Sequence, residues 1–345
     1  MIKSATEYAQ DSLKRHNARS VAGLTLRNAT GDIDQTSLGY QIAIDTLTFI
    51  KKQITEQKFY QVAPADYVPL AVGDGAFAQN ILTNLTVNAS GDFESGIINQ
   101  GSANDRLAVA QVGIASKTVR VVNWAKSVGY TIFEIEQALQ ANNWDLIESL
   151  HRARKTNWDL GVQKIAFLGS LQTPGVKGLY TQSDVNVDTS LITHRISDMT
   201  ATQFATFVSQ LVQAYQLNCA YTAMPTHFVI PQDDYNGLAT PVSPTYPLNS
   251  KLEYLKKAFD AIVPGGIKVL PSPYGMTAQN SLYNNTYRYL LYRYDPESLR
   301  MDVPVDYTVT QPNTNNNFQF QDAAYGQFTG VGVYRNLELL YLDLT

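Results

Sequence analysis

The stretch NNWDLIESLHRARKTNWDLGVQKIAFLG, residues 142–169, carries the strongest fold signal in the chain. Its apolar residues recur close to the 3.6-residue period of an α-helix, which predicts one helix over residues 143–168. Asn142-Asn143 is a favourable N-cap signal, and Gly169 is of the residue type that commonly ends a helix. At 1.5 Å per residue, such a helix is about 39 Å long. Its cations are expected on a solvated or interfacial face: Arg152, Arg154, Lys155 and Lys164.

A second helical signal lies just before this stretch. Thr131 and Glu134 form a capping-box pattern, in which each side chain bonds the other residue's backbone amide. Ile132, Ile135 and Leu139 fall on one face of the short helix that the pattern predicts.

Helix and strand signals alternate after residue 196. Thr200 is expected to cap an amphipathic helix whose apolar face carries Phe204, Phe207, Val208, Leu211, Val212 and Tyr215. Residues 227–230 predict a core strand that ends at Pro231. A third helix around residues 252–259 is stopped by Pro264-Gly265-Gly266, and residues 267–270 predict the next strand. The alternation indicates a compact α/β unit. Beyond it, β-branched and aromatic residues predict C-terminal strands within residues 286–294, 299–310 and 324–344.

Residues 76–123 predict a hairpin-like excursion from the body. Residues 80–87 and 118–122 are strand-like, while residues 89–105 between them are dense in Gly, Asn and Ser. A loop of this length in a compact domain is usually functional or disordered. Residues 1–40 contain few apolar anchors, so they predict an arm that is disordered or orders against a partner.

Composition excludes several classes of function. The chain has 345 residues, a net charge of −4 and 16% charged residues, against about 25% in average proteins. A surface with so few charged residues is typical of a protein that is largely covered by neighbouring molecules. The alternative is a plain neutral surface without such neighbours. Scattered Lys and Arg exclude a basic stripe, so any DNA contact is expected to be loose and sequence-blind. No apolar run approaches the ~20 residues of a membrane span. Cys219 is the single cysteine, which excludes a disulfide framework and indicates a cytoplasmic, reduced, soluble protein.

A search for catalytic residues finds none. The histidines stand in unrelated contexts, and none has a second histidine at metal-ligand spacing. His227 opens an apolar strand, which favours a packed or capping role, and Cys219 among apolar neighbours favours a buried thiol. Asp233-Asp234 follows a strand, yet a helix start or turn is favoured over a pair of catalytic carboxylates. The glycines of residues 169–178 lack the Gly-Lys-Ser/Thr ending of a phosphate loop. The sequence therefore predicts no catalytic, cofactor-binding or metal-binding residue and no cofactor.

The order of these parts resembles the major capsid protein family of tailed double-stranded-DNA phages and encapsulins, whose fold is called the Hong Kong 97-type. Three stretches carry the resemblance: residues 129–138, Ala166-Phe-Leu-Gly169 with Gly175–Leu179, and Gly330-Val-Gly-Val-Tyr-Arg335. The family often has proline soon after the closing arginine. Here Asn336 and Leu337 stand in that place.

The resemblance implies an α+β fold built as a Hong Kong 97-type subunit. Its parts would be a 1–40 N-terminal arm, a 76–123 extended loop, a peripheral domain with a long spine helix (41–75, 124–195 and 290–345) and a 196–289 α/β axial domain. It implies a non-enzymatic subunit that assembles in the host cytoplasm into hexamers and pentamers of a virion shell enclosing double-stranded DNA. Any scaffolding, portal or cement protein would be a separate chain, and no membrane is involved. An encapsulin-like compartment and an α/β enzyme with an inserted hairpin remain the alternatives.

Overall fold

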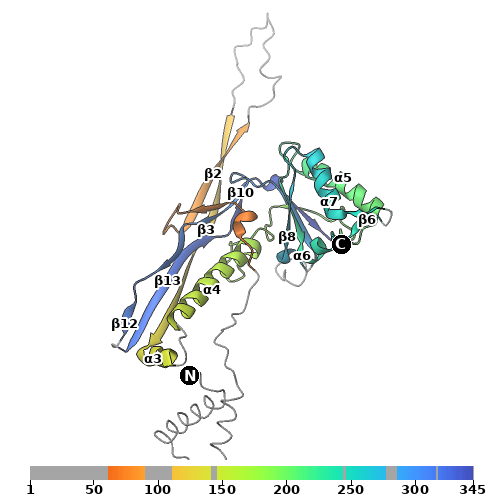
Figure 1. Cartoon of the computed structure of the whole chain (residues 1–345). Helices are drawn as coiled ribbons and strands as arrows, with labels where there is room; N and C mark the ends of the chain where they lie inside the picture. Colours follow the sequence, from red (N-terminus) through yellow and green to blue (C-terminus); the bar gives the residue numbers. More distant parts are fainter. Residues whose placement is uncertain are drawn as a thin grey trace, which may run out of the picture. The chain divides into compact units, whose positions relative to one another are not determined.

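The computed structural model describes residues 61–89, 111–140, 146–243, 246–276, 286–315 and 318–344. The predicted arm, the N-cap signal at Asn142-Asn143 and the middle of the predicted excursion lie outside these residues. Within them, three sheets of three or more strands, one small hairpin and five α-helices form the fold (Figure 1).

The predicted long helix is confirmed as α4, Leu146–Leu168. It ends at Gly169, whose φ of 77° lies in the left-handed region. A Cβ at Gly169 would collide with the backbone of Val176 and Gly178, so both conformation and close packing require glycine there. The preceding helix α3 is Ile132–Gln140. Its predicted capping box is also confirmed, because the Thr131 amide donates to the Glu134 carboxylate at 2.8 Å and the Glu134 amide to Thr131 Oγ1 at 3.2 Å.

The longest described strand is β3, Gln111–Thr131, which pairs with one strand along its first half and with another along its second half. Its first ten residues pair antiparallel with β2, Asn80–Ala89, as the predicted excursion required. The strand predicted at residues 118–122 continues beyond Val122 to Thr131, and residues 121–131 pair with β13, Gln319–Thr329. The strands β11, Val305–Val309, and β12, Asn313–Asn315, pair with the other edge of β13. A separate three-stranded sheet holds β1, Leu70–Val72, β10, Leu299–Val303, and β14, Val331–Val333.

The predicted α/β unit is built on a five-stranded sheet of order β4-β15-β9-β5-β8. The strands are Asn186–Asp188 (β4), Leu339–Asp343 (β15), Arg288–Tyr292 (β9), His227–Pro231 (β5) and Lys268–Ser272 (β8). Its helices are α5, Ala201–Asn218, α6, Gln232–Gly237, and α7, Lys251–Ile262, and a small hairpin joins β6, Pro241–Ser243, to β7, Tyr246–Ser250. Thr200 caps α5 as predicted, in a capping box with Gln203. The predicted apolar face of α5 is fully buried: Phe204, Phe207, Val208, Leu211, Val212 and Tyr215.

Two hydrophobic cores meet across this sheet. Alternate residues of β9 point to opposite faces, so Tyr289 and Leu291 join the core with α5 and α7, while Leu290 and Tyr292 join the core with α4. A strand buried on both faces holds the two cores together. The predicted boundary between residues 289 and 290 falls inside β9. How the sheets divide into peripheral and axial domains stays a prediction.

Candidate intersubunit surfaces

Three residues considered above for chemistry have packing roles in the structure: His227, Cys219 and Asp234. His227 is stacked against Tyr292 and Tyr294, at ring-centroid distances of 5.6 and 4.8 Å. Burial, with a smaller contribution from the nearby Lys268 charge, lowers the pKa of His227 to about 4, so its ring is neutral at pH 7. Cys219 is buried, with its Sγ 3.2 Å from the Ala223 carbonyl. The packed and buried interpretations are therefore confirmed for both residues.

Asp233 and Asp234 lie in the first turn of α6, which confirms the predicted helix start. The Asp234 carboxylate is fully buried and accepts hydrogen bonds from the Ser197 amide at 2.8 Å, the Ile196 amide at 3.1 Å and the Tyr289 hydroxyl at 2.7 Å. Asp234 therefore holds residues 196–197 close to β9 of the five-stranded sheet. Across the described part of the chain, no group of three or more His, Cys, Asp and Glu residues could hold a metal ion.

Arg154 corrects one expectation about α4. It was predicted on a solvated or interfacial face, but only 2% of the residue is exposed. Its guanidinium is paired with the Asp322 carboxylate of β13 at 2.7 Å and donates to the Tyr307 hydroxyl at 2.9 Å. The signal that could have found it is spacing, because Arg154 lies four residues before the buried Trp158 and thus on the same helix face.

The first candidate intersubunit surface is the two-stranded ribbon formed by β2 and β3. No described strand pairs with residues 111–120 of β3 on the edge opposite β2. Polar contacts hold its base: Lys117 Nζ donates to the Val333 carbonyl at 2.6 Å, and the Phe77 amide donates to Gln327 Oε1 at 2.7 Å. Leu82 on β2 is 60% exposed and Phe77 beside its start is 73% exposed. The ribbon therefore carries apolar side chains into solvent.

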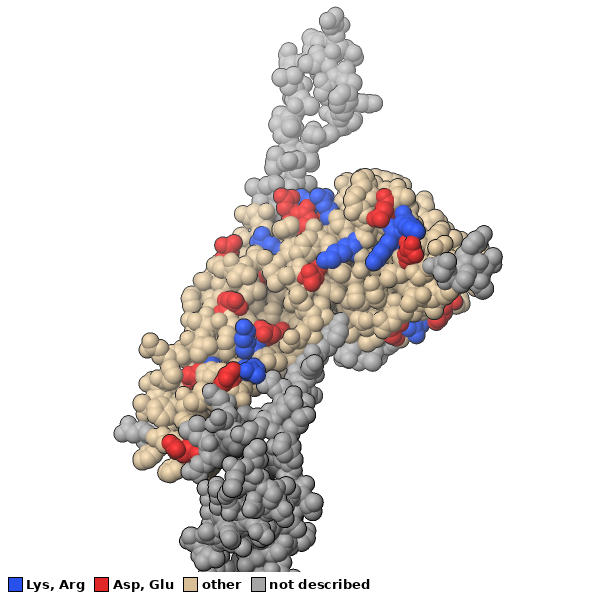
Figure 2. Space-filling view, viewed as in Figure 1, with Lys and Arg blue, Asp and Glu red and all other residues tan. Residues whose placement is uncertain are grey.

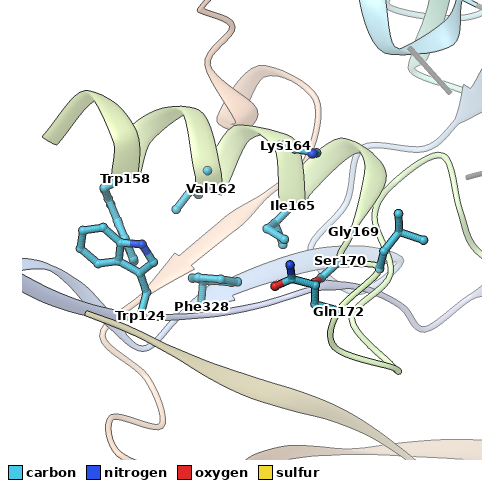
Figure 3. Close-up of a pocket in the computed structure, with 11 residues that line it drawn as sticks. Trp124, Trp158, Val162, Lys164, Ile165, Gly169, Ser170, Gln172 and Phe328 are labelled. Carbon is cyan, nitrogen blue, oxygen red and sulfur yellow. The ribbon is translucent and has the colours of Figure 1, made fainter. Parts of the chain in front are cut away.

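The second such surface is a groove between α4 and the β3–β13 pair, with a cavity volume of about 460 Å³ (Figure 3). Trp158, Val162 and Ile165 of α4 face Trp124 of β3 and Phe328 of β13 across it. At one end Trp158 lies tightly against Gly326, where any Cβ would collide with its ring. At the other end the loop of Gly169–Gln172 borders the groove, and its Leu171 side chain is 78% exposed. The groove was not foreseen from the sequence.

Charged groups are sparse on the visible face of the molecule, where Lys, Arg, Asp and Glu occupy scattered positions in a largely uncharged surface (Figure 2). No helix in the described ranges is long and apolar enough to cross a membrane.

Comparisons with known proteins agree on one family and one fold. The family model for the major capsid protein matches residues 95–344. The capsid of Myoviridae phage XM1 is similar at a TM-score of 0.69 and 15% identity, covering 87% of this chain and 98% of that one. A chain of Mycobacterium phage Ogopogo gives 0.55 and 13%, covering 88% and 99%, and the capsid of the native GTA particle gives 0.56 and 14%, covering 87% and 96%. No curated protein matches.

Proposed function

Since the chain belongs to the major capsid protein family and is a structural subunit of a phage capsid, we propose that its copies form hexamers and pentamers that close into an icosahedral shell. The shell encloses double-stranded DNA through loose, non-specific contacts, in keeping with a net charge of −4 and scattered cations. Assembly takes place in the host cytoplasm, and scaffolding, portal and cement proteins act as separate chains. The subunit itself has no catalytic role.

The β2–β3 ribbon is the observation that carries the proposed assembly. An isolated two-stranded ribbon is marginally stable in water, because it lacks a packed face. Ten residue pairs join β2 to β3, and two exposed apolar residues, Leu82 of β2 and Phe77 just before it, lie near the base of the ribbon. A neighbouring subunit supplies the missing burial. We therefore place the predicted extended loop, residues 76–123, over an adjacent subunit of the ring.

Helix α4 with the β3–β13 sheet forms most of the peripheral domain, and the unit of α5, α6 and α7 forms the axial domain. Residues 1–40 form the arm that reaches a neighbour. Support comes from the order of these elements along the chain and from the two hydrophobic cores.

The test is the assembled state of the expressed full-length chain. Size-exclusion chromatography and negative-stain microscopy should reveal capsomer rings or closed shells, since ring-forming subunits bury complementary surfaces. A stable monomer across protein concentration, salt and crowding agent would count against the proposal. Nuclease-resistant DNA in shells assembled during infection separates a phage head from an encapsulin-like compartment, whose shell would hold protein cargo instead.

A further inference from the structure

The turn that leads from β1 to β2, residues 73–79, has an unusual backbone. Gly73, Gly75 and Phe77 have φ values of 96°, 79° and 62°, all in the left-handed region. Glycine adopts such values at little cost, but a bulky residue with a positive φ is an outlier. Packing of the ring does not account for it, because Phe77 is 73% exposed. Strain of this kind persists only where the surrounding structure enforces it, and it is concentrated at functional and switching regions.

The contact that holds Phe77 in this conformation comes from β13. Gln327 is buried, and its Oε1 accepts a hydrogen bond from the Phe77 amide at 2.7 Å. Its Nε2 donates to Asn123 Oδ1 at 2.7 Å, and Asn123 lies on β3 directly opposite Gln327 in the sheet. The Gln327 side chain is therefore held at both ends and connects the turn to β13 and β3.

This turn lies where the β2–β3 ribbon leaves the rest of the subunit. Strand β3 changes its partner from β2 to β13 between Arg120 and Val121. In the described part of the chain, the backbone enters and leaves the ribbon body at two places, this point of β3 and the 73–79 turn. Because the ten residues of β2 span about 33 Å, a rotation of about 10° at the turn moves the far end of β2 by about 6 Å.

Two side-chain contacts hold the same base, one on each strand of the ribbon. Arg300 Nη2 of β10 donates to Thr83 Oγ1 of β2 at 3.3 Å. Lys117 Nζ of β3 donates to the Val333 carbonyl of β14 at 2.6 Å. Neither contact requires a positive φ at Phe77, so the strain belongs to the turn itself and to its contact with Gln327.

We propose that residues 73–79 form a strained elbow that sets the direction of the ribbon, and that Gln327 is the positioning residue that locks it. Loss of the Gln327 contact lets Phe77 return to a negative φ, which turns β2 away from its present course. The inference deepens the proposed function, on which it rests for the role of the ribbon, because it names the residues that control where the ribbon points. The elbow itself is a property of the single subunit.

Strain at Phe77 is tested by comparing Phe77→Gly with Phe77→Ala in the full-length, unassembled subunit. Both variants lose the exposed ring, but only alanine keeps the Cβ that opposes a positive φ. Urea unfolding followed by circular dichroism should give the glycine variant an unfolding equilibrium constant at least threefold below that of the alanine variant. At a negative φ the order is reversed, because glycine loses more conformational entropy on folding. An alanine variant as stable as the glycine variant would therefore contradict the strain.

The lock is tested by a distance between the ribbon and the sheet. Spin labels at Asn84→Cys of β2 and Thr308→Cys of β11 occupy exposed positions, and the native Cys219 is buried. Double electron–electron resonance should give one narrow distance distribution for the otherwise unchanged subunit. Gln327→Met should shift its maximum by about 5 Å or more, or double its width. Gln321→Met, the same substitution at an exposed position of β13, is the matched control and should change neither.

A second variant breaks the same contact without altering a buried residue. Phe77→Pro has no amide hydrogen to donate and holds φ near −65°, so it should give the same altered distribution as Gln327→Met. An unchanged distribution in either folded variant overturns the lock. Unfolding of both variants also overturns it, since the contact would then support the whole fold. Wild-type chains that form no shells would contradict the proposed function and leave the elbow standing.

Discussion

Arg154 of α4 and Asp322 of β13 form a buried ion pair, with the Nη2 and Oδ2 atoms 2.7 Å apart and both side chains almost fully excluded from solvent. The same guanidinium donates to the Asp322 carbonyl at 3.2 Å, and His151 Nδ1 lies 2.9 Å from it. This ion pair, together with the contact of Trp158 with Gly326, holds α4 against β13. The helix and the sheet therefore move as one body wherever these contacts persist.

Removing one member of this pair should destabilise the subunit strongly. Arg154→Met leaves the Asp322 charge buried without its partner, which costs about 3–5 kcal/mol. Urea unfolding of the unassembled subunit, followed by circular dichroism, measures the loss. Arg152→Met is the control, because Arg152 is an exposed residue paired with Glu148 on the same helix and should cost less than about 1 kcal/mol. Equal losses in the two variants would contradict the structural role of Arg154.

Acid should weaken the fold partly through His227. Its pKa is lowered to about 4 in the folded protein from an ordinary value near 6.5, so the unfolded chain binds the proton first as pH falls. The contribution of His227 is therefore fully present above pH 6.5 and is lost progressively between pH 6.5 and 4. His227→Phe keeps an aromatic ring between Tyr292 and Tyr294 but cannot be protonated. Thermal unfolding from pH 4 to 8 should reveal a smaller decline in the variant, whereas parallel curves would contradict this assignment.

Shortening the extended loop should separate folding from assembly. Replacing residues 88–106 with a short Gly-Ser turn removes none of the core residues that the structure describes. The circular dichroism of the subunit should stay unchanged, while closed shells are lost, because the contacts of the loop multiply around a ring. Negative-stain microscopy and light scattering check the result. Normal assembly of the shortened chain, or its outright unfolding, would show that the loop is not the clasp between subunits.

Gly161→Ala should stabilise the subunit. Glycine within a helix costs roughly 1 kcal/mol relative to alanine, and space around Gly161 is open. A glycine inside a helix can serve close packing against a strand or bending of the helix, and the open space around Gly161 contradicts the first of these. The hypothesis that Gly161 lets α4 bend as the shell changes shape predicts slower or incomplete expansion of Gly161→Ala shells, measured by scattering. Expansion at the wild-type rate would remove the bending role.

Local pattern in the sequence determined which segments form helices and strands and where many of them end. The period of α5 alone identified its buried face, and the capping boxes at Thr131 and Thr200 placed two helix starts. These features depend on residues within one or two turns of each other, so they can be recognised from neighbours in the chain. The order of these segments along the chain was also enough to predict the family.

Only the tertiary structure decided what those segments pack against. Asp322 lies 168 residues from Arg154, and β15 pairs with both β4 and β9 although long stretches of chain separate them. Periodicity indicates which face of a helix is buried, and Arg154 lies on that face of α4. Periodicity does not identify Asp322 as the partner that compensates the buried charge of Arg154. The groove beside Trp124 arises in the same way, because it belongs to no segment and exists only where α4, β3 and β13 are brought together.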